Sequence, residues 1–312
     1  MNKLKECRRL TPFQSDYLDF FRGLSAVLVL LSHICQIFWH EYFKIDFLNN
    51  VVNAVSGIAV MVFFVLSGFL ISTTIYRNLA KHQFKSFDSK KFIIDRLVRL
   101  YPPLLFTLLL MCIIYSICML FGFEGTRMNI EWANLLGTAF FLQNFYDYIE
   151  IPTMNGPLWS LSWEFWYYAF ALLFILATKK SPRYGLYLML ICVLALYSNR
   201  ALEFFSGLVV WCSGALIFYL FQTGWGKKKY QINVTYSALF LGLCFSYFFF
   251  STDIQSTIFS GGKKYVAGLT FSVILLLLLM KDKSKLSLSR RPIFKFFIKL
   301  IINFFINNTF NF

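Results

Sequence analysis

The chain has 312 residues, of which 58% are hydrophobic, 20% aromatic and only 14% charged. An ordinary soluble domain carries about 25% charged residues, so this composition excludes a soluble globular enzyme. The 30 lysines and arginines outnumber the 15 aspartates and glutamates, which gives a formal net charge of +15. These cations are concentrated between apolar runs, so membrane topology explains them and no nucleic-acid partner is expected.

Recurrent apolar runs are long enough to cross a hydrocarbon core about 30 Å thick, and they predict an all-α, polytopic transmembrane helix bundle of about 8 to 10 spans. The spans are expected at 18–39, 51–76, 100–122, 157–178, 184–199, 203–222, 233–250 and 265–280. Between these spans, 22 lysines and arginines fall on one side and 5 on the other, so the positive-inside rule places the N-terminus in the cytoplasm. We therefore expect a cytoplasmic segment (1–17), a membrane domain (18–291) and a tail (292–312).

Two segments fit this scheme less simply. Residues 135–145 are apolar but too short to cross alone, which favours a re-entrant or interfacial piece within a long outer loop. The tail is rich in Phe, Ile, Asn and Lys, and it is either a ninth span or an amphipathic surface segment.

The sequence contains no pattern that indicates a metal or nucleotide site. Its seven cysteines are scattered, mostly inside apolar runs and without zinc-like spacing. It has no P-loop, no G-x-G-x-x-G and no H-E-x-x-H motif, so nucleotide hydrolysis and zinc catalysis have no support.

Ionisable side chains inside a membrane span are energetically expensive and indicate function. The first span holds Asp19, Arg22 and His33. Arg22 and His33 are eleven residues apart, which places them on one helix face about 16 Å apart in depth. Asp19 and Arg22, at i and i+3, can neutralise each other, and the simpler alternative for them is a salt bridge at the cytoplasmic end of the helix.

Glu164 lies in the fourth span at a depth similar to that of His33, about 10 Å below the outer surface, so the two side chains are expected to meet. An imidazole oriented by a carboxylate is suited to remove a proton from a hydroxyl. The alternatives are a histidine satisfied by an ordinary hydrogen bond and a carboxylate that accepts hydrogen bonds from aromatic neighbours. Those neighbours are Trp159, Trp163, Trp166, Tyr167 and Tyr168.

Arg96 and Arg99 are i, i+3 neighbours just before the third span. Their planar guanidinium groups suit phosphate, although ordinary anchoring at the cytoplasmic surface explains them equally. The following Tyr101-Pro102-Pro103 is expected to end or kink the approach helix.

Ser67 and Gly68 lie in the second span, and Ser67 is not part of a G-x-S-x-G elbow. We therefore expect these two residues to permit close helix packing or the approach of a ligand to the backbone rather than to supply a nucleophile.

Four motifs in this order resemble the transmembrane acyltransferase 3 family, which O-acylates cell-surface glycans in bacteria. They are YLDFFRGLSAVLVLLSHI, FFVLSGFLIS, RLVRLYPP and GPLWSLSWEFWYY, and they cover roughly residues 16–170. The resemblance implies a multi-pass enzyme of the inner (plasma) membrane. Such an enzyme transfers an acyl group, commonly acetyl, from cytoplasmic acyl-CoA as co-substrate to a hydroxyl of a glycan or lipid-linked glycan, with no bound cofactor or metal.

The resemblance also assigns roles, because the motifs match the family residue by residue. It implies that His33 and Glu164 are catalytic and that Arg22, Arg96 and Arg99 bind the acyl donor. The supporting residues that it implies are Asp19, Ser67, Gly68, Trp159 and Ser160. In the implied mechanism His33 takes the proton of the acceptor hydroxyl, the alkoxide attacks the thioester carbonyl, and CoA leaves as a thiol. A covalent acyl-enzyme is a second route.

Two other functions stay open at this point. In a transporter or flippase the buried charges would form a proton or substrate path. In the other alternative the chain is an inactive homologue whose tail replaces the usual last helix. Members of the family often end in an S-Y-x-x-Y-L-x-H pattern, and its absence here suggests a truncation or frameshift near residue 292. The sequence identifies neither the acceptor, the acyl chain nor the oligomeric state.

Overall fold

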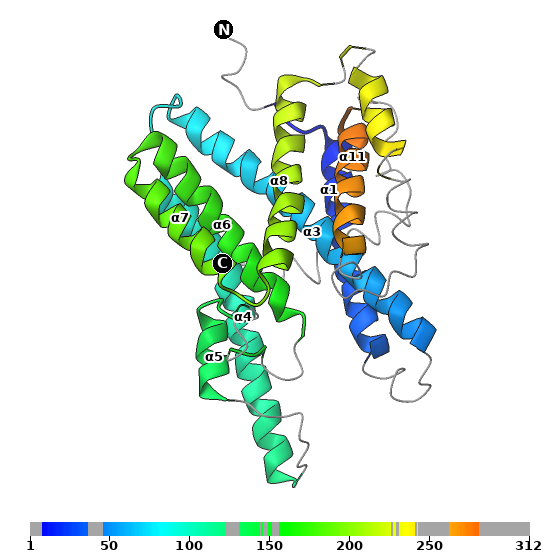
Figure 1. The fold of residues 1–312 in the computed structure, drawn as a ribbon, viewed down its shortest axis with the longest axis vertical. Coiled ribbons are helices and arrows are strands. Elements are labelled where there is room, and N and C mark those ends of the chain that lie inside the picture. The colour runs from blue at the N-terminus through cyan, green and yellow to red at the C-terminus, as the bar shows by residue number, and fades with distance from the viewer. Residues whose placement is uncertain are drawn as a thin grey trace. The chain divides into compact units, whose positions relative to one another are not determined.

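The computed structural model describes residues 8–36, 46–122, 131–143, 145, 149–151, 156–225, 227–228, 231–240, 242 and 262–280. All regular elements within these ranges are helical, which confirms the all-α fold class (Figure 1). Among them, six helices are long and apolar enough to cross a membrane, so the chain is a multi-pass membrane protein. These six are α1 (Pro12–Ile34), α3 (Asp46–Lys81), α4 (Ser89–Leu120), α6 (Leu158–Lys179), α8 (Ala201–Thr223) and α11 (Gly262–Met280).

Most of the predicted spans coincide with these helices. The spans predicted at 51–76, 203–222 and 265–280 lie inside α3, α8 and α11, and 157–178 differs from α6 by one residue at each end. The span predicted at 184–199 is the shorter α7 (Arg183–Leu196). Of the span predicted at 233–250, residues 233–240 and 242 are helical and the others lie outside the described residues, as does the tail at 292–312.

The first span begins earlier than predicted because its start is set by polar side chains. Thr11 caps α1. Its hydroxyl accepts a hydrogen bond from the backbone N–H of Gln14 at 3.3 Å, and the side-chain oxygen of Gln14 accepts one from the backbone N–H of Thr11 at 3.0 Å. This capping box satisfies two amides that a helix start otherwise leaves without partners. The helix therefore begins at Pro12 rather than at residue 18.

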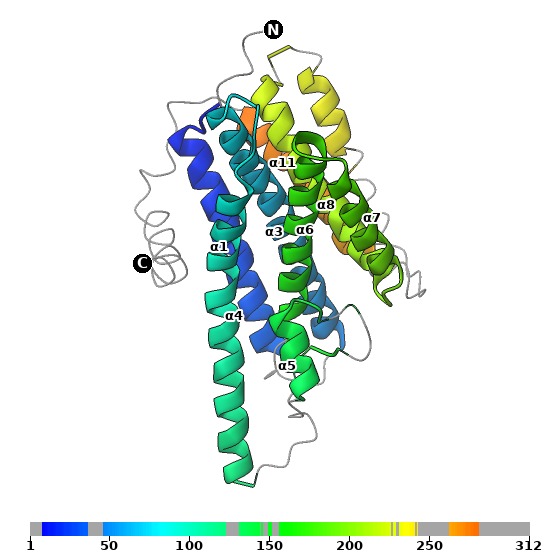
Figure 2. The ribbon, with the colours of Figure 1, turned by 90° about the vertical axis from the view of Figure 1, so that its left-hand side faces the viewer.

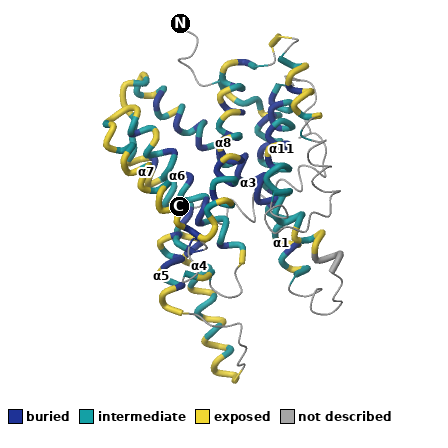
Figure 3. Tube along the Cα trace, in the orientation of Figure 1, coloured by how far each residue is buried: buried dark blue, intermediate teal, exposed yellow. Residues whose placement is uncertain are grey.

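The third span also begins earlier than predicted, and the expectation that its helix ends at the prolines is wrong, while the alternative of a kink stays a prediction. Asp88 caps α4 by accepting a hydrogen bond from the Lys91 amide at 3.0 Å, and the helix then runs from Ser89 to Leu120 with Pro102 and Pro103 inside it. Each proline removes one backbone donor. Apolar side chains are exposed along the following turns of α4, as expected where the surroundings are lipid (Figure 3).

The chain forms two compact units, each of which is described by itself. The first unit comprises residues 1–76 and 206–312 and contains α1, α11 and most of α3 and α8. α3 supplies its core, with Met61, Val65 and Phe69 at most 1% exposed. The side-chain NH2 group of Gln14 in α1 donates a hydrogen bond to the Leu279 carbonyl of α11 at 2.7 Å, so the start of α1 is fixed to the end of α11.

α3 and α8 approach each other closely at two glycines of the first unit. A methyl group added to Gly68 would meet the Trp211 carbonyl group and lie 3.3 Å from the Ala215 amide nitrogen. One added to Gly214 would meet the Val65 carbonyl and lie 2.9 Å from the Phe69 amide nitrogen. Small residues that allow backbones this close are typical of helix contacts in membranes.

The second unit comprises residues 77–205 and contains α4, α5 (Trp132–Ala139), α6 and α7. α6 packs beside α7 (Figure 2). Trp163 and Tyr167 of α6 are fully buried, and the Tyr167 hydroxyl donates to the Phe204 carbonyl at 2.9 Å. The Lys179 ammonium at the end of α6 lies 3.4 Å from the Phe84 carbonyl, near the turn before α4. This places the end of α6 beside the start of α4, on the side predicted to face the cytoplasm.

Candidate active site

Three ionisable residues of the first unit lie on α1. The Arg22 guanidinium is 3.6 Å from the Asp19 carboxylate, which confirms the predicted ion pair between residues one turn apart. His33 lies near the other end of α1 and is half-buried. Among the described residues no hydrogen bond to the His33 ring is found, and both interpretations of this histidine stay predictions.

Ser67 and Gly68 are part of the packing between α3 and α8. The Trp211 indole N–H donates to the Ser67 hydroxyl at 3.3 Å, and Gly68 faces the Trp211 backbone. These contacts confirm the close-packing interpretation of the two residues.

In the second unit a polar group of side chains joins α4 to α6. It consists of Arg96, Arg99, Glu164 and Tyr168, and we call it the α4–α6 cluster. The Tyr168 hydroxyl donates a hydrogen bond to the Glu164 carboxylate, and Arg99 interacts electrostatically with Glu164. This confirms the alternative in which Glu164 accepts a hydrogen bond from an aromatic neighbour.

Sequence analysis expects Arg99 at the cytoplasmic end of its span, but the structure places it further along α4; Glu164 lies six residues after the start of α6. α4 begins ten residues before Arg99, so Arg99 lies about 15 Å along the helix, within electrostatic reach of Glu164. The early helix start and its continuation through Pro102 explain the difference.

Arg96 lies one turn before Arg99 and has a different environment. Its guanidinium carbon is 5.8 Å from the ring centres of both Phe92 and Tyr168. Its Nε is buried and has no hydrogen-bond partner within the described part of the chain. The cluster holds two guanidinium groups and one carboxylate, so it carries a net positive charge suited to an anionic group.

The short segment predicted to be re-entrant or interfacial folds onto α6. α5 ends at Ala139, and Phe141 follows with a positive φ of 58°, which is unusual for a bulky residue. The Phe141 carbonyl accepts two hydrogen bonds, from the Ser162 hydroxyl at 2.6 Å and the Trp166 indole at 2.8 Å. These bonds from α6 hold the turn in its strained conformation.

Two fully buried polar side chains of this segment are not completely satisfied. The Gln143 amide group donates to the Leu158 carbonyl at 3.1 Å, but its oxygen finds no donor among the described residues. The Thr138 hydroxyl likewise has no hydrogen-bond partner in the described chain. Buried polar groups of this kind reduce stability unless an ordered water satisfies them.

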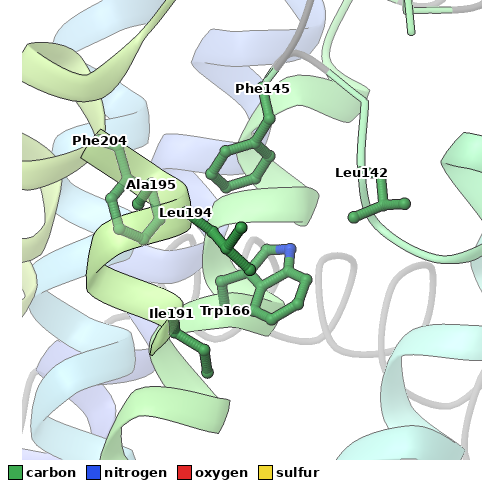
Figure 4. A pocket seen from close by; sticks show the side chains of 7 residues that line it. All are labelled: Leu142, Phe145, Trp166, Ile191, Leu194, Ala195 and Phe204. Atoms are coloured by element: carbon green, nitrogen blue, oxygen red, sulfur yellow. The ribbon is translucent and has the colours of Figure 1, made fainter. Parts of the chain in front are cut away.

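The second unit also contains an apolar cavity of about 70 Å³. It is lined by Leu142, Phe145, Trp166, Ile191, Leu194, Ala195 and Phe204 (Figure 4). Trp166 is two positions after Glu164, which places the two side chains about 200° apart around α6. The cavity is therefore on the opposite face of α6 from the α4–α6 cluster and is not part of it.

The remaining predicted residues stabilise the start of α6. The Trp159 ring packs edge-to-face on Trp163 at 4.9 Å, and the Ser160 hydroxyl donates to the Pro157 carbonyl at 3.0 Å. Of the residues now found around Glu164, sequence reasoning gave Tyr168 only as one of several possible donors. Its spacing of four residues from Glu164 is the signal that would have selected it.

Residues 15–310 match the acyltransferase domain of the acyltransferase 3 family, which takes in nearly the whole chain and the tail. The chain belongs to this family. This confirms the resemblance seen in the four motifs, and the family supports an acyltransferase that uses an acyl donor.

Two curated relatives are similar to parts of the chain. An uncharacterized protein of Haemophilus influenzae is 34% identical over 124 residues, which cover 38% of this chain and 49% of the relative. The peptidoglycan O-acetyltransferase OatA of Listeria monocytogenes is 29% identical over 190 residues, 56% of this chain and 27% of OatA. The alignments thus span about half and about a quarter of these relatives. No solved structure matches the chain.

The candidate residues are divided between the two units. Asp19, Arg22 and His33 belong to the first, and Arg96, Arg99 and Glu164 to the second. Within each unit the structure brings together Asp19 with Arg22, and Arg99 with Glu164. The expected meeting of His33 with Glu164 stays a prediction.

Proposed function

We propose that this protein is an integral membrane O-acyltransferase of the cell envelope. It takes an acyl group, expected to be acetyl, from cytoplasmic acyl-CoA and transfers it to a hydroxyl of a cell-surface or exported glycan. The family match over residues 15–310 carries this proposal. The name of the partial relative OatA supports an ester-forming reaction with a glycan acceptor. The inner (plasma) membrane is the expected location, because it has access to both acyl-CoA and exported glycans.

In this proposal His33 acts as the general base. It accepts the proton of the acceptor hydroxyl as the oxygen attacks the thioester carbonyl. The C–S bond then breaks, the new ester forms, and the His33 imidazolium returns the proton to the sulfur, so that CoA leaves as a thiol. A half-buried imidazole inside a membrane helix supports this role, because histidine is the side chain best suited to accept a proton near neutral pH. We assign Glu164 as a catalytic carboxylate within the membrane, where a charged group is expensive unless it has a function.

The donor is expected to bind through guanidinium groups. Arg96 is the best candidate in the second unit, because its Nε has no partner in the described chain and the α4–α6 cluster has a net positive charge. Arg22 is the candidate in the first unit, with Asp19 holding its side chain in place. Arg99 interacts electrostatically with Glu164, so we assign it primarily to neutralising the carboxylate.

The proposal is tested by measuring O-acetyl esters on isolated envelope glycans by proton NMR. The strains are the parent, a deletion of the gene, and the deletion complemented with the wild type, His33→Ala or His82→Ala. His82 lies in the turn after α3 and serves as the matched control, since it removes a histidine outside the candidate site. Acetyl esters are expected to disappear on deletion and to return with the wild type and His82→Ala, but not with His33→Ala.

The outcomes separate the proposed function from its rivals. Purified protein should also release thiol from acetyl-CoA when the deletion strain's glycan is added, whereas a transporter or flippase should release none. Unchanged acetylation after deletion, together with no thiol release, would refute the acyltransferase assignment. Full complementation by His33→Ala would refute the role of this histidine alone.

A further inference from the structure

We infer that Tyr168 is a positioning residue of the transfer reaction: its hydroxyl fixes Glu164 while its ring supports Arg96. This inference rests on the proposed function, and it assigns a role to a residue that ends the fourth motif but received no role from the resemblance. The observation behind it is that one buried side chain contacts both the carboxylate and the candidate donor-binding cation of the α4–α6 cluster.

The hydroxyl contact restrains the carboxylate. Tyr168 follows Glu164 by four residues on α6, so the two side chains lie one above the other on the same helix face. Tyr168 is only 4% exposed, which leaves its hydroxyl little access to solvent and favours the bond to Glu164. A hydrogen bond to an ionised acceptor is about twice as strong as one between neutral groups, so one Glu164 oxygen is held in a defined place.

Arg99 completes the restraint from α4. It interacts electrostatically with Glu164, so the carboxylate has a hydrogen-bond donor on its own helix and a cation within electrostatic reach on the neighbouring helix. A carboxylate held from two directions is preorganised, which is how a positioning group contributes to rate. Removal of the Tyr168 hydroxyl takes away the restraint that comes from the carboxylate's own helix.

The ring contact adds a second role. The Arg96 guanidinium lies 5.8 Å from the Tyr168 ring centre, within the distance at which a cation is attracted to an aromatic face. The same ring therefore restrains the position of the Arg96 side chain of α4 relative to Glu164 of α6. Loss of the hydroxyl and loss of the ring should have separable effects, because they act on different partners.

Tyr167 is a matched control on the same helix. Its hydroxyl is also buried and donates a hydrogen bond, but to the Phe204 carbonyl at 2.9 Å. Tyr167→Phe therefore removes a comparable buried hydrogen bond without touching Glu164 or Arg96. It should lower stability while leaving transfer unchanged.

The kinetic test measures thiol release from acetyl-CoA by the purified full chain, with the deletion strain's glycan as acceptor. Tyr168→Phe keeps the ring, so kcat is expected to fall about 10- to 100-fold while the KM for acetyl-CoA changes less than about twofold. Tyr168→Leu removes the ring as well, and its KM should also rise by about three- to tenfold as the cation–π contact is lost. Tyr167→Phe should leave both constants within about twofold of the wild type. Equal kcat for Tyr168→Phe and wild type would overturn the inference.

A stability measurement keeps the inference testable if the proposed reaction is wrong and the wild type releases no thiol. Melting temperatures are compared for Tyr168→Phe in the wild-type and Glu164→Met backgrounds, since methionine has similar length but no carboxylate. The hydroxyl should stabilise the wild type and have almost no effect beside methionine, whereas Tyr167→Phe should lower both backgrounds equally. The same loss in both backgrounds for Tyr168→Phe would refute the contact with Glu164.

Discussion

The close approach of α3 and α8 makes Gly68→Ala the most informative test of the fold. The atoms in the way of a new methyl group belong to the Trp211 backbone, whose carbonyl carbon is 3.0 Å from the position that the methyl would occupy and whose oxygen is closer still. Backbone atoms cannot rotate aside as a side chain would. The two helices must therefore separate by on the order of 1 Å, which forfeits about a quarter to a half of each van der Waals contact along the seam.

This separation sets the magnitude of the effect. Overpacking in a well-filled core typically costs about 1–3 kcal/mol, and a backbone obstruction belongs at the upper end of that range. We expect Gly68→Ala to lower the free energy of unfolding by about 3 kcal/mol, or the melting temperature by about 8 °C for a protein of this size. Gly214→Ala should have a similar effect, because it meets the Val65 carbonyl across the same seam.

The assay is thermal unfolding of the purified protein in one detergent, followed by tryptophan fluorescence. Gly185→Ala is the control: an added methyl on this α7 residue meets nothing within 4 Å, so only the higher helix propensity of alanine remains, and stability should rise by about 0.5–1 kcal/mol. The double variant Gly68→Ala/Gly214→Ala should lose little more than either single variant, because one separation relieves both obstructions. A Gly68→Ala protein as stable as the wild type, or fully additive losses, would refute the close seam.

Two further variants test the interior of the second unit. Ala195→Val is expected to raise the melting temperature by about 2 °C, because the cavity is partly open and the two added methyl groups bury apolar surface worth about 0.8 kcal/mol in it; a lower melting temperature would mean that the cavity has no room for them. Thr138→Val removes a buried hydroxyl that has no partner in the described chain and keeps the shape of the side chain. Calorimetry should therefore record an increase of about 1 kcal/mol in the free energy of unfolding, whereas a decrease would reveal an ordered partner such as water.

Hydropathy predicted where the helices run, and polar details decided where they begin. The bounds predicted for α6 are correct to within one residue. The largely apolar run lies between Pro157 at its start and two lysines, Lys179 and Lys180, at its end. The start of α1 was missed by six residues, although Thr11 and Gln14 carry the spacing of a capping box. The start of α4 was missed because the amphipathic turns before Leu100 are too polar to read as a span.

The candidate site was predictable residue by residue but not in its contacts. The Asp19–Arg22 pair follows from spacing on one helix, so sequence reasoning found it. The neighbourhood of Arg99 and Glu164 depends on how far α4 extends and on the register of two antiparallel helices, which no local pattern specifies. The positive φ of Phe141 is equally hidden, since phenylalanine rarely adopts it and the carbonyl bonds that hold it come from α6.

The seam between Gly68 and Gly214 also constrains how the protein is made. The two glycines are separated by almost half of the chain, and ribosomes add about 5–20 residues per second. α3 must therefore remain in the membrane for on the order of ten seconds before α8 exists to cover its glycine face. During that interval the seam is open to other membrane helices with small residues, which can pack against the same glycine face.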